Sequence, residues 1–512
     1  MTMTAGARTH LVILLLLGAL TTFHVPLAQP LEDAFQEGEY AAFGFLAQTQ
    51  PGFHMPVLIH GQLDVLPSRA AALLCRAEAQ MVCVRGINMG LQFVAVVLFI
   101  ALLAGLAGLG SLLAVVAGGP AVAMLWLYNG PTERIADAHQ GTPSLRDLFV
   151  LAALLVMARL CRRIDRGDGA GLAAGLVGLG VLAAVGQFWA YNRGLALDVV
   201  VGLFALGLCL VRHSVRPIAW VIAGGVAGLV AVVMLGGMGL VEATLFDIRY
   251  WSRNGGMWHL PLVPVVAVPV GLLALFVVAR GWPVAVAAFR AGRSGRGLML
   301  AALAAVFALY VVQSFNRPDL LHVRWVMWPA ALLLAMVIRA WAAPMLPAVA
   351  HRDAMRLATF LLVASAAIEF YSDSSILRFA LAGLGENIAT AGRPAPSDRD
   401  LADPDLARVA DVVAASGGCT FAANNAGIVH LLSRRPPCSR FAFGIYVAAD
   451  QQDAVIAELE AARPGVILWE SAAWWSHIDQ RDFPARAPVL AGWITAHYPV
   501  RTVIGPHVLL SR

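Results

Sequence analysis

Four carboxylates follow the first apolar segment within eight residues: Glu32, Asp33, Glu37 and Glu39. A helix would place Asp33 and Glu37 on one face, because they are four positions apart. Such a pair at the end of a membrane helix could supply a general base, or bind an acceptor or a metal. The alternative is a solvated helix beside the membrane, in which acidic residues are inert. We predict Asp33 as the base, with Glu37 second and Glu39 as a further catalytic candidate.

A second polar motif lies in residues 59–64, where His60 and Asp64 are again four positions apart. A histidine and a carboxylate at this spacing can form a charge pair or share a metal ion. A zinc site needs at least three protein ligands in register, and this spacing matches no zinc signature. We therefore assign His60 and Asp64 to substrate binding and no residue to a metal. A divalent cation is left open as a cofactor, and no other cofactor is expected.

Polar and cationic residues at the ends of later apolar segments could bind a phosphate. Arg193 and Arg249 are two of them, and Arg317, Asp319 and His322 form a third group. Arginine at a membrane surface commonly anchors the protein to lipid headgroups, but its planar guanidinium also binds phosphate through a fork of donors. The third group is hard to explain as an anchor alone. All five residues are therefore predicted substrate or phosphate contacts.

The composition is that of a membrane protein. Of 512 residues, 59% are hydrophobic and only 13% are charged, against roughly 25% charged in soluble domains. We predict eleven spans, most near the roughly 20 residues that cross the hydrocarbon core: 11–27, 91–108, 110–128, 147–161, 170–189, 195–211, 217–240, 261–279, 298–315, 325–341 and 356–370. The net charge of +5 comes without lysine and without a run of arginines. Nucleic-acid binding is therefore not expected.

The arginines between these spans predict the orientation. Four arginine-bearing loops fall on one side of the membrane in this count: 162–166, 212–216, 280–296 and 339–356. They are cytoplasmic if the N-terminus is cytoplasmic, as the positive-inside rule requires. The loop at 30–90 and the C-terminal region then face the outside. Whether the first apolar segment is a cleaved signal peptide is left open.

From residue 371 the apolar runs shorten, and Pro, Asp and Arg become frequent. We predict a helical membrane domain at 1–370 and a small α/β domain at 371–512. Its expected elements are helices at 403–415, 453–462 and 489–497, strands at 419–422, 441–447 and 465–469, and a hairpin at 502–510.

The cysteines add two expectations. Cys419 and Cys438 fall in this region and could pair in an oxidising compartment. Cys75 and Cys83 would lie too far apart in a continuous helix to form a bridge, unless the chain turns between them.

These features resemble the GT-C superfamily of integral-membrane glycosyltransferases. The resemblance rests on the many spans, the outer C-terminal α/β domain and the acidic first loop. In that loop Asp33-Ala34-Phe35-Gln36-Glu37-Gly38-Glu39, followed by His60-Gly61 and Asp64, is similar to a pattern of bacterial members. The superfamily's common Asp-Glu or Asp-Asp pair stands here as Glu32-Asp33, in reverse order.

The resemblance implies transfer of a sugar from a polyprenyl-phosphate donor to an extracytoplasmic glycan, lipid or protein, with inversion. One carboxylate would take the acceptor's proton while cationic groups stabilise the leaving phosphate. It also implies a multi-pass protein of the bacterial inner membrane, with membrane lipids and the lipid-linked donor as partners. Two alternatives stay open. One is a transporter or flippase of a lipid-linked or small polar substrate, and the other is a surface-glycan polymerase or ligase.

Overall fold

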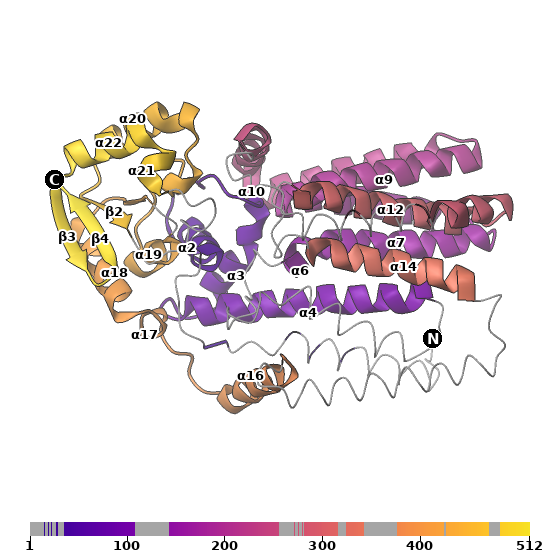
Figure 1. Cartoon of the computed structure of the whole chain (residues 1–512), viewed down its shortest axis with the longest axis horizontal. Helices are drawn as coiled ribbons and strands as arrows, with labels where there is room; N and C mark the ends of the chain where they lie inside the picture. The colour runs from indigo at the N-terminus through magenta and orange to yellow at the C-terminus, as the bar shows by residue number, and fades with distance from the viewer. Residues whose placement is uncertain are drawn as a thin grey trace.

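The chain is mostly helical in a computed structural model (Figure 1). Besides a few single positions, the structure describes residues 35–107, 143–254, 281–315, 324–342, 376–423, 426–470 and 482–512. The first loop holds α2 (Phe35–Thr49), η1 (Gln62–Val65) and α3 (Leu66–Leu74). The bundle holds α4 (Gln80–Ala107), α6 (Pro143–Arg146), α7 (Leu148–Asp165), α8 (Leu172–Trp189), α9 (Tyr191–Arg212), α10 (Arg216–Asn254), α12 (Ser294–Phe315), η4 (Arg324–Val326) and α14 (Met327–Ala342).

Five of the described helices are long and apolar enough to cross a membrane: α4, α8, α9, α10 and α12. They coincide with predicted spans, although α4 begins at Gln80, so the first loop is shorter than the predicted 30–90. The predicted spans at 11–27, 110–128 and 356–370, and most of 261–279, lie outside the described residues. The helices α8 and α10 come close at Gly224, because a Cβ there would collide with the carbonyl of Val177 on α8.

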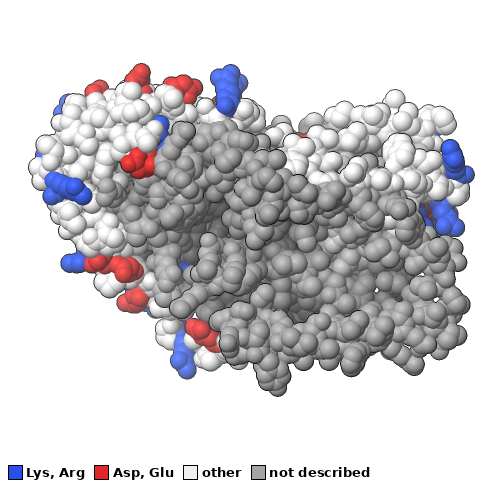
Figure 2. Space-filling model, viewed as in Figure 1, with Lys and Arg blue, Asp and Glu red and all other residues white. Residues whose placement is uncertain are grey.

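Three of the four arginine-bearing loops come to one end of the bundle. Successive helices alternate in direction, because short connections join α7 to α8, α8 to α9 and α9 to α10. Asp165 at the end of α7 accepts hydrogen bonds from the backbone N–H groups of Gly295 (2.8 Å) and Arg296 (3.1 Å). In Figure 2 basic residues appear at this end of the bundle, and basic and acidic residues both appear over the C-terminal region at the other end.

The C-terminal region builds a four-stranded sheet among short helices. Its strands, β1 (Phe421–Ala422), β2 (Val466–Glu470), β3 (Val500–Ile504) and β4 (His507–Ser511), lie in the order β1-β2-β4-β3. β1 pairs with β2 in parallel, and the other pairs are antiparallel. Its helices are α16 (Ile376–Thr390), α17 (Asp398–Leu401), α18 (Pro404–Ser416), α19 (Gly427–Ser433), η5 (Gly444–Tyr446), η6 (Ala449–Gln451), α20 (Gln452–Ala462), α21 (Phe483–Arg486) and α22 (Pro488–His497).

The predicted helices at 403–415, 453–462 and 489–497 and the terminal hairpin are confirmed. The predicted strand at 441–447 is wrong. This stretch forms the 3-10 turn η5 and joins the sheet only through one bridge between Phe443 and Ala422. Its apolar residues are buried without forming a strand, because short apolar runs report burial more reliably than element type.

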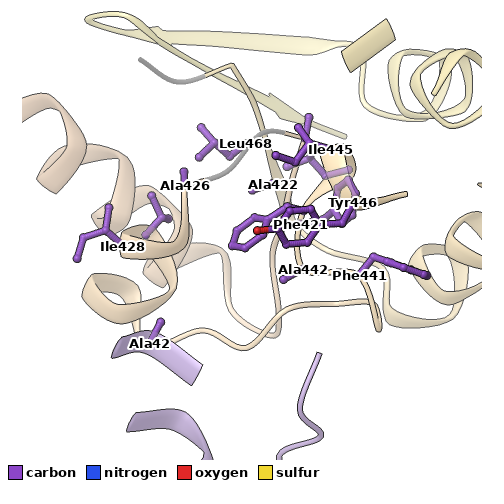
Figure 3. Packing of buried hydrophobic residues seen from close by; sticks show 14 of the residues in the cluster. Ala42, Phe421, Ala422, Ala426, Ile428, Phe441, Ala442, Ile445, Tyr446 and Leu468 are labelled. Carbon is purple, nitrogen blue, oxygen red and sulfur yellow. The ribbon is translucent and has the colours of Figure 1, made fainter. Parts of the chain in front are cut away.

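One hydrophobic core joins the first loop to the C-terminal region. It contains Tyr40, Ala42 and Phe43 of α2 together with buried residues of β1, α19, β2 and β4. Figure 3 shows Ala42 on α2 beside α19, which carries Ile428. Because this core is shared, the C-terminal region holds α2 in place from the side opposite the bundle.

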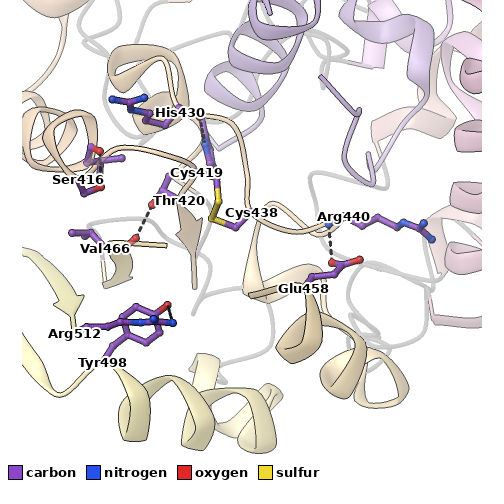
Figure 4. Close-up of a disulfide and its surroundings, with 12 residues drawn as sticks. Ser416, Cys419, Thr420, His430, Cys438, Arg440, Glu458, Val466, Tyr498 and Arg512 are labelled. Carbon is purple, nitrogen blue, oxygen red and sulfur yellow. Dashed lines mark hydrogen bonds between the residues drawn. A yellow bond between two sulfur atoms is a disulfide. The ribbon is translucent and has the colours of Figure 1, made fainter. Parts of the chain in front are cut away.

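Two disulfides tie this part of the chain. The predicted Cys419–Cys438 bridge is confirmed, with its Cα atoms 5.0 Å apart (Figure 4). Cys75 and Cys83 are also bridged, with a Cα separation of 6.4 Å. A continuous helix would forbid this second bridge, but α3 ends at Leu74 and α4 starts only at Gln80, so the chain turns between them.

Candidate active site

Glu39 is the carboxylate of the acidic stretch that the structure buries among other polar side chains. Its side chain is fully buried, and its Oε2 accepts a hydrogen bond of 2.8 Å from the hydroxyl of Tyr446. Its Oε1 has no hydrogen-bond partner among the described residues. A buried carboxylate oxygen left without a partner is uncommon in stable folds and points to a functional group.

Glycines at a helix crossing fix the position of Glu39. A Cβ at Gly38 would come within 2.5 Å of the backbone nitrogen of Ile428 in α19, and a Cβ at Gly427 would collide with the backbone of Glu39. The two helices can therefore approach backbone to backbone only with glycine at both positions. Gly38 therefore allows α2 to pack closely against α19, and this packing buries the side chain of Glu39.

Burial changes the ionisation of Glu39. Loss of solvent raises its pKa to about 8, and the nearby carboxylate of Asp247 acts in the same direction. The hydrogen bond from Tyr446 opposes the rise, because it favours the ionised form. Glu39 is therefore largely protonated at neutral pH and can change charge near the pH at which many enzymes work.

The His60–Asp64 motif is brought next to Glu39 by a close approach to the bundle. A Cβ at Gly61 would collide with the carbonyls of Phe188 and Trp189 at the end of α8, so the turn needs glycine here. Asp64 is 1% exposed, and neither of its oxygens has a hydrogen-bond partner in the described part of the chain. Burial raises its pKa, Arg146 lowers it, and the charge of Glu39 raises it further.

Arg146 is the cation of this cluster, and the sequence reasoning missed it. Its Nη2 lies 2.7 Å from Nε2 of His60. Because arginine only donates, that nitrogen must be the acceptor and the imidazole is neutral, with its proton on Nδ1. Burial together with the charge of Arg193 lowers the pKa of Arg146 to about 10. Its place at the end of the four-residue helix α6, just before an apolar run, was the available signal.

Arg193, a predicted phosphate contact, is buried inside the bundle. It is 1% exposed, and its Nε lies 3.1 Å from Oδ1 of Asp147. Its guanidinium also stacks over the ring of Tyr310, with 4.1 Å to the centroid. Asp147 in turn accepts hydrogen bonds from Tyr310 (2.6 Å) and Trp328 (2.7 Å). Arg193 is thus held inside the bundle by a carboxylate, where its charge also acts on Arg146.

The remaining predicted residues are separated from this cluster or lie beyond the described ranges. Arg249 is on α10, with an exposed side chain. Glu37 belongs to α2, but its side chain is not among those described. Asp33, and the group of Arg317, Asp319 and His322, lie outside the described residues. The structure therefore brings together Glu39, His60 and Asp64 of the predicted set, and it adds Arg146, Tyr446 and Asp247.

The His60–Asp64 pair is not arranged as a metal site. In the described ranges, no three side chains of His, Cys, Asp and Glu converge on one point. A guanidinium faces Nε2 of His60, where a bound cation would be repelled. The cluster holds two buried carboxylic acid side chains, Glu39 and Asp64, and one buried cation, Arg146.

No family model and no curated protein matches this sequence. Solved structures that resemble this chain over most of its length are found. ArnT from Cupriavidus metallidurans bound to undecaprenyl phosphate is 12% identical, with a TM-score of 0.46, and the match covers 99% of this chain and 98% of that one. ArnT in the apo state gives 13% and 0.48 over the same shares. The Archaeoglobus fulgidus oligosaccharyltransferase, in complex with Zn and sulfate, gives 11% and 0.46 over 92% of this chain and 70% of that one.

Proposed function

We propose that this chain is a membrane glycosyltransferase of the GT-C type, which moves a sugar from a polyprenyl-phosphate donor to an extracytoplasmic acceptor with inversion. The observation that carries the proposal is the buried trio of Glu39, Asp64 and Arg146, at the end of an apolar helical bundle. A base and a cation at the boundary of a membrane suit transfer from a lipid-borne phosphate. The acidic first loop, whose sequence resembles that superfamily, supports the same reading.

The reaction requires one proton acceptor and one group that stabilises a leaving phosphate. The acceptor's hydroxyl oxygen attacks the anomeric carbon and forms the new glycosidic bond, while the bond from that carbon to the phosphate oxygen breaks. The proton of the hydroxyl passes to a carboxylate, for which Glu39 is the described candidate and Asp33 and Glu37 are the others. Arg146 is placed to stabilise negative charge on the departing polyprenyl phosphate, with Arg317 as a further proposed contact.

The proposed orientation places this site outside the cell. The arginine loops at 162–166, 212–216 and 290–296 gather at the end of the bundle that is remote from the site, which suits a cytoplasmic face. The site and the C-terminal region from residue 371 would then lie in the periplasm, and the protein in the bacterial inner membrane. Nucleotide-linked donors are not available there, so a lipid-linked donor is the consistent choice.

The test is sugar transfer by purified protein in nanodiscs, with a radiolabelled polyprenyl-phosphate sugar as donor. Glu39→Gln should reduce the rate by roughly 10²–10⁴-fold if it is the base, and Asp33→Asn and Glu37→Gln decide between it and its neighbours. Asp411→Asn, which changes a surface carboxylate paired with Arg399, serves as control. Retention of normal transfer by all three acidic-stretch variants would refute the acidic site. Movement of the lipid across the bilayer without any transfer would favour a flippase.

A further inference from the structure

A cavity of about 620 Å³ lies beside the acid cluster, the buried group of Glu39, His60, Asp64 and Arg146, and Asp247 lines it. Its walls come from residues 53–69 of the first loop, residues 236–247 of α10 and Arg440 of the C-terminal region. The helix breaks at Gly237, where the backbone takes φ of 73°, so the cavity sits against a bend in α10. It adjoins the proposed active site, because Gln62 in its wall belongs to the same turn, η1, as Asp64.

The wall toward the acid cluster is a built polar surface. Asp247 is 1% exposed, and its Oδ2 accepts hydrogen bonds from Nε2 of Gln62 (2.6 Å) and the backbone of Leu58 (3.4 Å). Gln62 is 2% exposed, and its Oε1 has no partner among the described residues. An amide oxygen left without a partner in such a wall has capacity for a ligand's hydroxyl.

Part of the cavity wall is apolar and belongs to the bend of α10. Gly236, Gly239 and Leu240 line it, and the neighbouring Leu235 and Met238 are 60% and 58% exposed. Exposed apolar side chains on a spanning helix face the hydrocarbon. A ligand in this cavity can therefore keep an apolar tail in the membrane while its head reaches Asp247.

The cavity is lined by charged residues of both signs and not by a cluster of cations alone. Arg69 and Arg440 line it together with the carboxyl groups of Glu242 and Asp247. Arg440 is also engaged, with its guanidinium 4.5 Å from the ring centroid of Phe246. Figure 4 shows its backbone nitrogen bonded to Glu458. A lining of mixed sign with buried hydrogen-bonding groups suits an uncharged head rich in hydroxyls, such as a sugar.

We propose that this cavity binds the sugar head of a membrane-borne acceptor, with Asp247 accepting a hydrogen bond from one of its hydroxyls and Gln62 forming a second. The identity of the ligand as an acceptor substrate rests on the glycosyltransferase function proposed above. The binding of an uncharged, hydroxyl-rich amphiphile does not. A head bound there lies next to η1, the turn that carries Asp64.

The probe for the test is octyl glucoside carrying a diazirine at the end of its tail, added to the full-length protein in nanodiscs. After photolysis, peptide mapping by mass spectrometry should find labels in residues 236–247. Two probes with the same tail, diazirine octanol and diazirine octyl phosphate, separate the contribution of the head from that of the tail. We expect the glucoside to label several-fold more than either. Equal or stronger labelling by the phosphate probe would overturn the assignment of an uncharged head.

Matched glycine variants test the location. A Cβ at Gly239 or at Gly225 would meet no atom within 4 Å, so leucine fits at both positions of α10. Gly239→Leu should fill the cavity and abolish glucoside labelling, while Gly225→Leu should leave it unchanged. Asp247→Asn keeps the volume and should weaken labelling about tenfold, as expected for the loss of one buried hydrogen bond. Labelling that survives in Gly239→Leu and in Asp247→Asn would refute the proposal.

The same variants separate this inference from the proposed function. If transfer is observed but Gly239→Leu leaves the KM for the acceptor unchanged, the cavity is not the acceptor site and the function stands. If the glucoside labels the cavity as expected but no polyprenyl-phosphate sugar supports transfer, the proposed function fails and the binding site stands.

Discussion

The hydroxyl of Tyr446 lies 2.8 Å from Oε2 of Glu39, so the C-terminal region reaches the buried carboxylate of the first loop. Tyr446 is itself held on two sides. Its ring meets Trp251 edge-on at 5.7 Å between centroids, and its backbone carbonyl accepts a hydrogen bond from the hydroxyl of Tyr250. The ionisation of Glu39 therefore depends on how the C-terminal region is seated against α10 and α2.

Replacing Tyr446 with phenylalanine should raise the pKa of Glu39 further, because the lost hydrogen bond favours the ionised carboxylate. If Glu39 is the base, transfer by the wild type should increase with pH up to about 8. In Tyr446→Phe the midpoint should move upward by about one unit. Tyr498→Phe removes another buried hydroxyl of the C-terminal region and should not move it. An unchanged midpoint in Tyr446→Phe would show that the hydrogen bond does not tune the base.

The buried state of Glu39 also predicts how stability depends on pH. Its pKa is about 8 in the folded protein against an ordinary 4.5, so between these values the unfolded chain is ionised while the folded chain stays protonated. Folding is therefore penalised as the pH rises through this window. Thermal unfolding in nanodiscs between pH 4 and pH 9 should show a decline in Tm that becomes shallower in Glu39→Gln. Parallel curves for the two proteins would mean that Glu39 is more solvated than described.

Arg146 and Asp64 should be coupled in stability. The charge of Arg146 opposes the rise that burial causes in the pKa of Asp64, so removal of the guanidinium leaves that carboxyl group in a less favourable site. We expect Arg146→Met to destabilise the protein strongly, and Asp64→Asn to offset part of that loss in the double variant. The coupling is measured by a double-mutant cycle on thermal or denaturant unfolding. Additive effects would show that the two side chains do not interact.

Both disulfides should be present in protein isolated without reductant. Removal of the Cys419–Cys438 bridge by Cys419→Ser and Cys438→Ser frees a loop of 19 residues, and should lower stability by about 3 kcal/mol. Mass spectrometry of unreduced peptides tests the pairing, and thermal unfolding tests the cost. Cys209→Ser alters a free cysteine in the bundle and serves as the control. Free thiols at Cys75, Cys83, Cys419 and Cys438 would contradict the pairing and the oxidising location.

The topology can be tested with fusion reporters. Reporters in the loops at 162–168 and 290–296 should report the cytoplasm, because arginines accumulate on that side. Reporters near residue 319 and after residue 400 should report the periplasm. Alkaline phosphatase and green fluorescent protein at each position give opposite signals, which controls for expression. A cytoplasmic signal after residue 400 would place the candidate site on the wrong side for the proposed reaction.

The sequence by itself determined the class of protein, the described helices of the bundle and most elements of the C-terminal region. These depend on local properties: the length of the apolar runs, and their shortening after residue 371, where Pro, Asp and Arg become frequent. The Cys419–Cys438 pairing could be predicted from the sequence, because both cysteines lie in one short region. Local patterns failed at 441–447, where an apolar run forms a buried turn.

Only the tertiary structure decided which of these groups meet and how they ionise. Tyr446 approaches Glu39 from 407 positions away, and Asp247 and Arg146 come from separate helices. Arg193, predicted from its place at the end of a span, is held inward by Asp147. The physical reason is that a pKa and a hydrogen bond depend on burial and on the nearest charges in space. Contacts between segments far apart in the chain set both, and no spacing within one segment encodes them.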